Sequence, residues 1–319
     1  MSSIADSLAE SRQLRRRAGT WRIAAFIAAG IAILAVGARL SPSLLHGGAY
    51  IARVRVSGVI AGDQAQLKQI RGLAKSSASA VLLDLDSPGG TTAGSEELYL
   101  ALRELAAKKP VAAVVGTMAA SGAYIAALGA DRIFVRGNSI VGSIGVIVEF
   151  PNFSGLMDKV GVQFEEIKSS PLKAAPNGLT PTSPEARAAM ADLVADSYAW
   201  FKDLVKTRRA MSDDELAKID DGRVFSGRQG IVLKLADAMG GEAEAIDWLV
   251  KDKGVAKDLP VREMPAPSAL ERMGLASSLA AGALDAFGWR HAAELVKEAG
   301  SEGGGPETGL MSIWRVDAR

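Results

Sequence analysis

The pattern of hydrophobic and polar positions changes its period several times along this chain. Over residues 51–59, apolar and basic residues alternate, which is typical of a half-buried strand. Short apolar runs predict three buried strands, at 80–85, 111–115 and 132–135. One helix-like segment, at 64–75, precedes the predicted strand at 80–85, and another, at 94–108, follows it. Because strands that alternate with helices form parallel sheets covered by helices, we expect an α/β fold.

The N-terminal segment has a different pattern, in which basic residues precede a long uncharged stretch. Arginines stand at positions 12, 15, 16, 17 and 22, and residues 23–38 carry no charge. A helix that spans a bilayer needs about 20 apolar residues, so we expect a transmembrane anchor at 21–40. The arginines predict that residues 1–20 form a cytoplasmic tail and that the bulk of the chain lies on the other side. A cleaved signal peptide is the alternative, because Val36-Gly37-Ala38 resembles a small-residue cleavage site.

Turn-forming residues predict the remaining boundaries. Residues 41–49 include one proline and two glycines, and we interpret them as a tether before a domain at 50–267. Two prolines end that domain, and residues 268–319 form a C-terminal extension with an alanine-rich helical stretch and a flexible glycine-rich link. Within the domain, Ser183 and Pro184 predict the start of a helix over 185–209, because proline favours the first helical position.

One serine stands at a predicted turn between a strand and a helix. Ser121 lies among small residues, after the strand at 111–115 and before an alanine-rich, helix-like run at 124–130. We expect its hydroxyl to be exposed at a helix N-terminus, where free N–H groups can bind a developing negative charge. The same pattern is also typical of a close packing point between a helix and a strand.

A pair of glycines follows the strand at 80–85. Ligands of parallel sheets bind beyond the carboxyl ends of the strands, and both this glycine pair and Ser121 fall at such ends. A glycine exposes its backbone N–H without a side chain in the way, so the N–H groups near Gly90 and Gly122 are candidate oxyanion donors. A plain tight turn is the alternative interpretation of the glycine pair.

Composition limits the chemistry that Ser121 can perform. The 319-residue chain has no cysteine, which excludes thiol nucleophiles and thiolate metal sites, and its net charge of +1 offers no field for nucleic acid. Its two histidines, His46 and His291, are poorly placed to act as a base, so a Ser-His-Asp triad is not expected. The base for Ser121 must then be a lysine, a carboxylate or an amino terminus. A lysine can act as the base only where burial favours its neutral form. The aspartates have no ligand-like spacing, so we expect neither a metal nor a cofactor.

Four short motifs follow one another in the order found in a known family. They are Asp86-Ser-Pro-Gly-Gly90, Gly116-Thr-Met-Ala-Ala-Ser-Gly122, Ala130-Asp-Arg-Ile133 and Val141-Gly-Ser-Ile-Gly-Val146. Together they resemble the signal peptide peptidase A (SppA) family of membrane-anchored serine proteases, and the similarity extends over about residues 50–248. The resemblance implies a ClpP/crotonase-like α/β fold with a repeated ββα core.

The resemblance also implies a Ser-Lys dyad. The family's lysine follows its serine by about fifty residues, a place that Lys173 occupies here, with Lys168 as the nearest rival. Ser121 is then the nucleophile, Ser143 orients the lysine, and Gly90 with Gly122 supplies the oxyanion hole. Three neighbouring positions depart from the usual family residues, Ala123, Ile125 and Leu172, which leaves the shape of the pocket open.

The function implied by the resemblance is degradation of remnant signal peptides and other small extended peptides. It implies an enzyme anchored in the bilayer through residues 21–40, single-pass in a bacterial-type inner membrane, with the catalytic domain on the extracytoplasmic side. A ring-shaped homo-oligomer is also implied, in which the lysine comes from the same or from a neighbouring subunit. Two alternatives stay open: a crotonase-like acyl-CoA enzyme and a non-catalytic membrane scaffold of the same fold.

Overall fold

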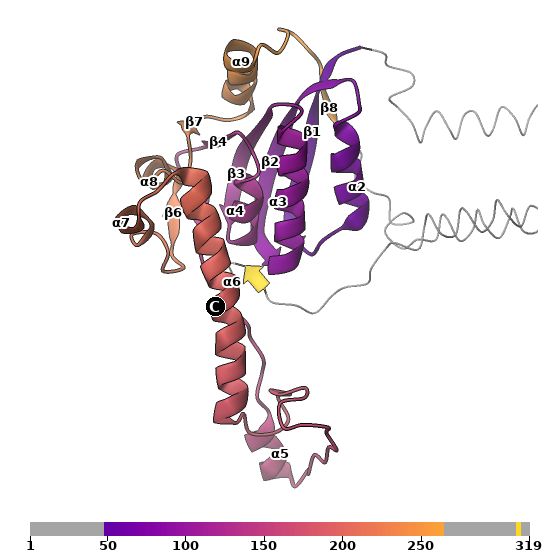
Figure 1. The fold of residues 1–319 in the computed structure, drawn as a ribbon, viewed down its shortest axis with the longest axis vertical. Coiled ribbons are helices and arrows are strands. Elements are labelled where there is room, and N and C mark those ends of the chain that lie inside the picture. The colour runs from indigo at the N-terminus through magenta and orange to yellow at the C-terminus, as the bar shows by residue number, and fades with distance from the viewer. Residues whose placement is uncertain (1–47, 265–310, 314–319) are drawn as a thin grey trace, which may run out of the picture. The chain divides into compact units, whose positions relative to one another are not determined.

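The computed structural model describes residues 48–264 and 311–313 (Figure 1). Its elements in chain order are β1 (Tyr50–Ile60), α2 (Gln64–Leu73), β2 (Ala78–Thr91), α3 (Thr92–Ala106), β3 (Val111–Ala120), α4 (Gly122–Ala127), β4 (Arg132–Val135), β5 (Ile140–Gly142), α5 (Ser154–Val160), α6 (Pro184–Arg209), α7 (Asp213–Leu216), β6 (Val224–Ser226), α8 (Gly227–Val232), β7 (Ala238–Met239), α9 (Glu242–Lys253), β8 (Val261–Glu263) and β9 (Met311–Ile313).

These strands form one mixed sheet. Its central order is β6-β5-β3-β2-β1-β8, with β4 also beside β3, β7 beside β4, and β9 beside β2. Strands β1, β2, β3 and β4 pair in parallel, as the alternation of strands and helices predicts. The pairs β2–β9 and β5–β6 are antiparallel. The predicted α/β class is therefore confirmed.

Both faces of the central strands are buried. In β2, Val81, Leu83 and Leu85 join a core with helices α2, α3 and α4, which cover one face of the sheet in Figure 1. The intervening Ala80 and Leu82 join a second core with Trp248 and Leu249 of α9. Successive strand residues point to opposite faces, so burial on both faces requires an unbroken apolar run. This explains why the sequence at 80–85 does not alternate.

Two central strands extend beyond the runs that predicted them. The sequence predicts strands at 80–85 and 111–115, whereas β2 continues to Thr91 and β3 to Ala120. Their later residues are small and lack a hydrophobic signal, but they have sheet partners. The end of β1 pairs with the glycine turn of β2, and β5 pairs with the last three residues of β3. Pairing with neighbouring strands therefore extends both strands where local propensity does not.

A segment before α6 carries many exposed apolar side chains. We call residues 147–172 the apolar lobe; its exposed large hydrophobic residues are Ile147, Phe153, Leu156, Val160, Val162, Phe164, Ile167 and Leu172. None of the residues of α5, which lies in this lobe, is buried. Figure 1 shows α5 beyond the N-terminal end of α6, away from the sheet. The α6 helix itself begins as predicted, with the Ser183 hydroxyl accepting a hydrogen bond from the Ala186 N–H.

Several predicted segments lie outside the described residues. They are the tail at 1–20, the anchor at 21–40, most of the tether at 41–49, and the extension at 268–319 apart from β9. Within residues 48–264 and 311–313, no helix has both the length and the apolar character needed to cross a bilayer.

Candidate active site

Ser121 occupies a strained turn between β3 and α4. Its backbone has φ of 56° and ψ of −119°, a combination that residues other than glycine rarely adopt. Hydrogen bonds fix this turn on both sides. The Ser121 N–H donates to the Gly142 carbonyl of β5 at 2.8 Å, and the Ser121 carbonyl accepts from the N–H groups of Tyr124 and Ile125 at 2.9 and 3.1 Å. Strained backbone held by surrounding bonds is characteristic of functional sites.

The expected exposure of Ser121 is wrong. Only 1% of the residue is exposed, and all six residues of α4 behind it are buried. The sequence indicates a serine at a turn, and turns usually lie at the surface. Here the bond to β5 and the packing of α4 enclose the turn. A substrate must therefore reach Ser121 along a path that the tertiary structure defines.

Ser143 lies close to Ser121 because a backbone hydrogen bond joins Ser121 to the residue before Ser143. The Gly142 carbonyl that accepts from Ser121 belongs to the residue immediately before Ser143. Ser143 is buried, also has a positive φ, of 55°, and donates its N–H to the Arg223 carbonyl at 2.8 Å. The structure therefore brings together three of the predicted site residues, namely Ser121, Gly122 and Ser143.

The glycine turn is held rigidly at the end of β2. A side chain on Gly90 would place its Cβ 1.9 Å from the Ile60 carbonyl oxygen, so only glycine fits this close approach. The buried Ser87 hydroxyl donates to the Gly58 carbonyl at 2.6 Å and accepts from the Gly89 N–H at 3.1 Å. Sequence reasoning missed this role of Ser87, although the residue lies within one of the quoted motifs. The turn is therefore preorganised, as an oxyanion donor must be.

Lys173 lies between α5 and α6, in a segment that is not part of the sheet leading to Ser121. It lies in an exposed turn just after the apolar lobe, where its N–H donates to the Ser170 carbonyl at 3.1 Å. In the part of the chain that the structure describes, its ammonium group forms no ion pair or hydrogen bond. The segment between α5 and α6 lies away from the sheet in Figure 1. Its rival Lys168 is paired with Glu166 at 2.5 Å.

Behind α4, a polar cluster joins segments that are distant in sequence. The Tyr124 hydroxyl donates to the Leu235 carbonyl at 2.9 Å, and complete burial raises the pKa of its phenol. Asp237 accepts from the Ile133 N–H at 2.7 Å and pairs with Arg209 of α6 at 2.7 Å. The cluster therefore holds α4, β4 and α6 together beneath the Ser121 turn. Sequence reasoning did not assign a role to Tyr124, Asp237 or Arg209.

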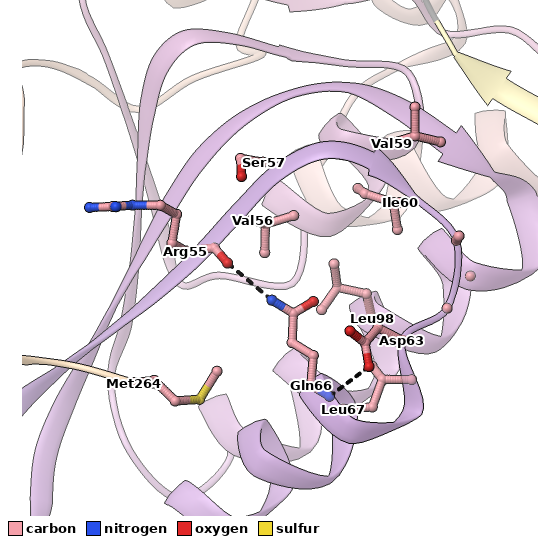
Figure 2. Close-up of a pocket in the computed structure, with 13 residues that line it drawn as sticks. Arg55, Val56, Ser57, Val59, Ile60, Asp63, Gln66, Leu67, Leu98 and Met264 are labelled. Carbon is pink, nitrogen blue, oxygen red and sulfur yellow. Dashed lines mark hydrogen bonds between the residues drawn. The ribbon is translucent and has the colours of Figure 1, made fainter. Parts of the chain in front are cut away.

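A pocket of about 370 Å³ lies on the β1 side of the glycine turn (Figure 2). Val59 and Ile60, which line it, pair with Gly89 and Gly90 of β2. Figure 2 shows the Arg55 side chain pointing away from the apolar residues, while the Gln66 amide donates to the Arg55 carbonyl at 3.0 Å. Neither serine of the candidate site lines this pocket, so it is separate from the site.

Within the described ranges, no group of histidine, cysteine and acidic residues has the arrangement of a metal site. The groups that the structure brings together at the candidate site are hydroxyl groups and backbone N–H groups. A buried serine on a strained turn, next to a rigid glycine turn at the end of a neighbouring strand, fits nucleophilic attack on a carbonyl with electrostatic stabilisation of the oxyanion.

Comparison with known proteins agrees with this chemistry. Residues 103–256 match Peptidase family S49. A Synechocystis protein named as a candidate protease is 36% identical over 210 residues, which cover 65% of this chain and 76% of that protein. An Enterococcus faecium protein named as a candidate signal peptide peptidase SppA is 33% identical over 191 residues, covering 59% of this chain and 54% of that protein.

A solved structure of a Listeria monocytogenes ClpP1 mutant is similar over 61% of this chain and 94% of that chain, with a TM-score of 0.41 and 12% identity. This likeness is too slight to establish a shared fold. The family of this chain is therefore assigned from its sequence relatives and from the four ordered motifs in its sequence. The chain belongs to Peptidase family S49, in its signal peptide peptidase A branch, and is a serine peptidase.

Proposed function

We propose that this chain is a membrane-anchored Ser-Lys endopeptidase that degrades remnant signal peptides and other small extended peptides. The observation that carries the proposal is the Ser121 turn. It combines positive φ, a backbone bond to Gly142 beside Ser143, and a position at the end of the sheet that also holds the Gly90 turn. Membership of the S49 family supports peptide bonds as the substrate.

In the proposed mechanism, neutral Lys173 accepts the proton of the Ser121 hydroxyl as its oxygen attacks a peptide carbonyl. The C–N bond then breaks, Lys173 gives its proton to the leaving amine, and water hydrolyses the acyl-enzyme. The N–H groups near Gly90 and Gly122 bind the tetrahedral oxyanion. Ser143 orients the lysine.

We propose further that Lys173 acts on Ser121 of a neighbouring copy. Its exposure after the apolar lobe, in a segment that lies away from the sheet, supports this arrangement. Eight exposed large hydrophobic residues in the lobe also support a protein contact, because monomeric proteins rarely leave contiguous apolar patches in water. Docking of the lobe on a second copy would bury these residues and remove water from the lysine, which favours its neutral form.

The location of the enzyme is also a proposal. The uncharged segment after the N-terminal arginines supports an inner-membrane anchor at 21–40 and an extracytoplasmic catalytic domain. Such a location would place the enzyme beside signal peptides that have been left in the bilayer. Substrates would bind as extended strands against the end of the sheet.

The proposal is tested with a fluorophosphonate probe, which phosphonylates an activated serine with loss of fluoride. We expect peptide mapping to locate the label on Ser121, and we expect the label to be lost in Lys173→Ala but retained in Lys168→Ala. Absence of label on the folded wild-type chain would support the non-catalytic scaffold. Stabilisation by coenzyme A together with that absence would support the acyl-CoA alternative.

A mixing experiment tests the contribution of a second copy. Ser121→Ala and Lys173→Ala chains are each inactive if both groups are required. We expect chains that are co-expressed and assembled together to recover peptidase activity, because some interfaces then combine an intact serine with an intact lysine. A mixture without activity, in which both chains are shown to share one assembly, would mean that each dyad forms within a single chain.

A further inference from the structure

The loops that precede the parallel strands meet at one end of the sheet, opposite to the end that carries Ser121. Tyr50, the first residue of β1, lies opposite Ala78 of β2, and Val81 lies opposite Val111 of β3. Strand β8 runs beside β1 in the same direction. Figure 1 shows the start of β1 at the end of the sheet where α9 and β8 lie. These loops, together with the end of α9, therefore form one surface of the domain.

Basic side chains are concentrated on this surface. The Lys109 ammonium donates to the Ser76 carbonyl at 2.7 Å and so joins the loops before β3 and β2. Arg132, at the start of β4, lies 5.7 Å from the centroid of the Trp248 ring, and Lys253 lies 5.2 Å from it. We call the following six residues the basic face: Lys75, Lys108, Lys109, Arg132, Lys253 and Lys257.

Much of this positive charge has no counterion within the domain. In residues 48–264 and 311–313, the exposed side chains of Lys75, Lys108 and Lys257 form no ion pair and no hydrogen bond. The buried Nε of Arg132 also lacks a hydrogen-bond partner there. Charges that no neighbouring group neutralises are available to a partner outside the domain.

The acidic residues of the same surface do not cancel this charge. Asp131 is already engaged, because it pairs with Arg103 at 3.5 Å and accepts a hydrogen bond from the Val111 N–H at 2.9 Å. Asp252 and Asp258 are exposed among the basic residues, and they are fewer than the six cations of the basic face. Positive charge therefore predominates, and such a surface attracts an anionic partner.

The place of this surface along the chain indicates which anionic partner it meets. The expected anchor at 21–40 is joined to Tyr50 by the nine residues 41–49. Nine extended residues span at most about 30 Å, so an anchor in the bilayer keeps the start of β1 within that distance of the headgroups. Ser121 lies ten residues along β3 from Val111, which corresponds to roughly 30 Å in the opposite direction. The tether therefore brings the basic face, rather than the Ser121 end, to the bilayer.

We infer that the basic face docks on anionic phospholipid headgroups of the bilayer that holds the anchor. This inference rests on the membrane anchorage in the proposed function. Attraction between lysines and such a surface acts over about one Debye length, roughly 8 Å in physiological salt, so the basic face must lie almost on the headgroups. Docking then holds the Ser121 end roughly 30 Å from the bilayer. Peptides would reach this end after they have left the membrane.

The test measures which part of the domain lies at the membrane surface. Because the chain has no cysteine, one introduced cysteine gives a unique label. In the full-length chain reconstituted into vesicles, a fluorophore is attached to Ser77→Cys, in the exposed loop beside Lys75, or to Asp158→Cys on α5. Lipids with a nitroxide headgroup quench a fluorophore at the membrane surface. In phosphatidylcholine vesicles that contain phosphatidylglycerol, we expect quenching at position 77 but not at position 158, and we expect high salt to abolish it.

Two matched charge variants test whether the basic face is responsible. The first variant combines Lys75→Gln, Lys108→Gln and Lys257→Gln. The control combines Lys68→Gln, Arg187→Gln and Lys218→Gln, at exposed positions outside the basic face. Both variants lose the same net charge. A basic residue near an anionic surface strengthens binding about fivefold, so we expect the ratio of docked to undocked protein to fall roughly 100-fold in the first variant and little in the control.

Equal quenching at position 77 in the two variants, or in vesicles without anionic lipid, would overturn the inference. Quenching at position 158 would place the apolar lobe on the bilayer and would overturn it too. The proposed function fails on other observations: release of the wild-type chain from vesicles by alkaline carbonate would refute the anchor, and absence of fluorophosphonate label on Ser121 would refute the peptidase. In either case, the comparison of the two charge variants still decides whether the basic face binds anionic lipid.

Discussion

At the residue scale, the candidate site depends on backbone positions more than on side-chain contacts. Ser121 and Ser143 have positive φ, and Gly90 allows an approach that any Cβ would block. Such positions are costly for ordinary residues and persist only where neighbouring groups hold them. Substitution at these positions should therefore affect activity more than the small size of the residues would indicate.

Gly90→Ala tests the close approach at the glycine turn. The added Cβ would lie 1.9 Å from the Ile60 carbonyl oxygen, so the turn must move. The N–H groups of the turn would move with it. We expect a loss of about 100-fold or more in kcat, the effect of losing one oxyanion donor. The control is Gly72→Ala in α2, where no atom lies within 4 Å of the new Cβ. Near-normal kcat in Gly90→Ala would remove this turn from the mechanism.

Tyr124→Phe tests the buried hydrogen bond behind α4. Loss of the bond to the Leu235 carbonyl should lower the free energy of unfolding by about 1 kcal/mol near neutral pH, measured by urea denaturation. Burial raises the pKa of this phenol, so the folded state holds its proton more tightly than the unfolded state does. The contribution is therefore present below about pH 10, the ordinary tyrosine pKa, and is lost as the pH rises further.

The alkaline loss should consequently be smaller in Tyr124→Phe than in the wild type. Tyr99→Phe is the matched control, because within residues 48–264 and 311–313 no hydrogen bond of the Tyr99 hydroxyl is present. Identical pH dependence of unfolding in the wild type and Tyr124→Phe would show that this phenol does not couple to folding.

At the element scale, the sequence indicates which segments form the central sheet but not which strands pair with the ends of β2 and β3. The apolar runs predict β2 and β3, yet the glycines and alanines that extend them carry no hydrophobic signal. Their conformation depends on partners from β1, β5 and β9. The candidate site lies in these extensions. For this reason, motif order indicated its residues, while periodicity alone did not.

Asp237→Ala tests the joint between elements beneath the site. The carboxylate accepts from the Ile133 N–H of β4 and pairs with Arg209 of α6, and the two paired side chains are only 29% and 12% exposed. Removing it leaves a largely buried guanidinium and a backbone N–H without their partner, so we expect a loss of about 3 kcal/mol in unfolding free energy. Asp247→Ala, which removes an exposed partner of Lys251, should cost less than about 1 kcal/mol. Similar losses in both variants would contradict the proposed role of the joint.

At the scale of the whole molecule, the predicted dyad is divided between two regions. Ser121, Gly122 and Ser143 meet at the end of the sheet, whereas Lys173 follows the apolar lobe. A sequence motif gives the order of such residues but not their distance in space. Whether Lys173 meets a serine depends on the contact that the lobe makes, which the proposal assigns to a second copy.

Leu156→Glu combined with Val160→Glu tests that contact. Both residues are exposed on α5, so the charges should leave the fold intact but place two carboxylates in the proposed interface. We expect analytical ultracentrifugation to show a smaller assembly, and peptidase activity to fall in parallel. Leu100→Glu on α3 provides the control, because this residue is also exposed but lies outside the lobe. An unchanged assembly with full activity would argue against the lobe as the interface.

The α/β class, the positions of the central strands and the four ordered motifs of the S49 family follow from the amino-acid sequence alone. These features are local, because apolar periodicity and turn residues depend on neighbours along the chain. The tertiary structure alone decided that Ser121 is buried, that Ser87 fixes the glycine turn, and that β9 pairs beside Gly90. Each of these depends on backbone groups far apart in sequence, and backbone hydrogen bonds leave little trace in the side chains that a sequence records.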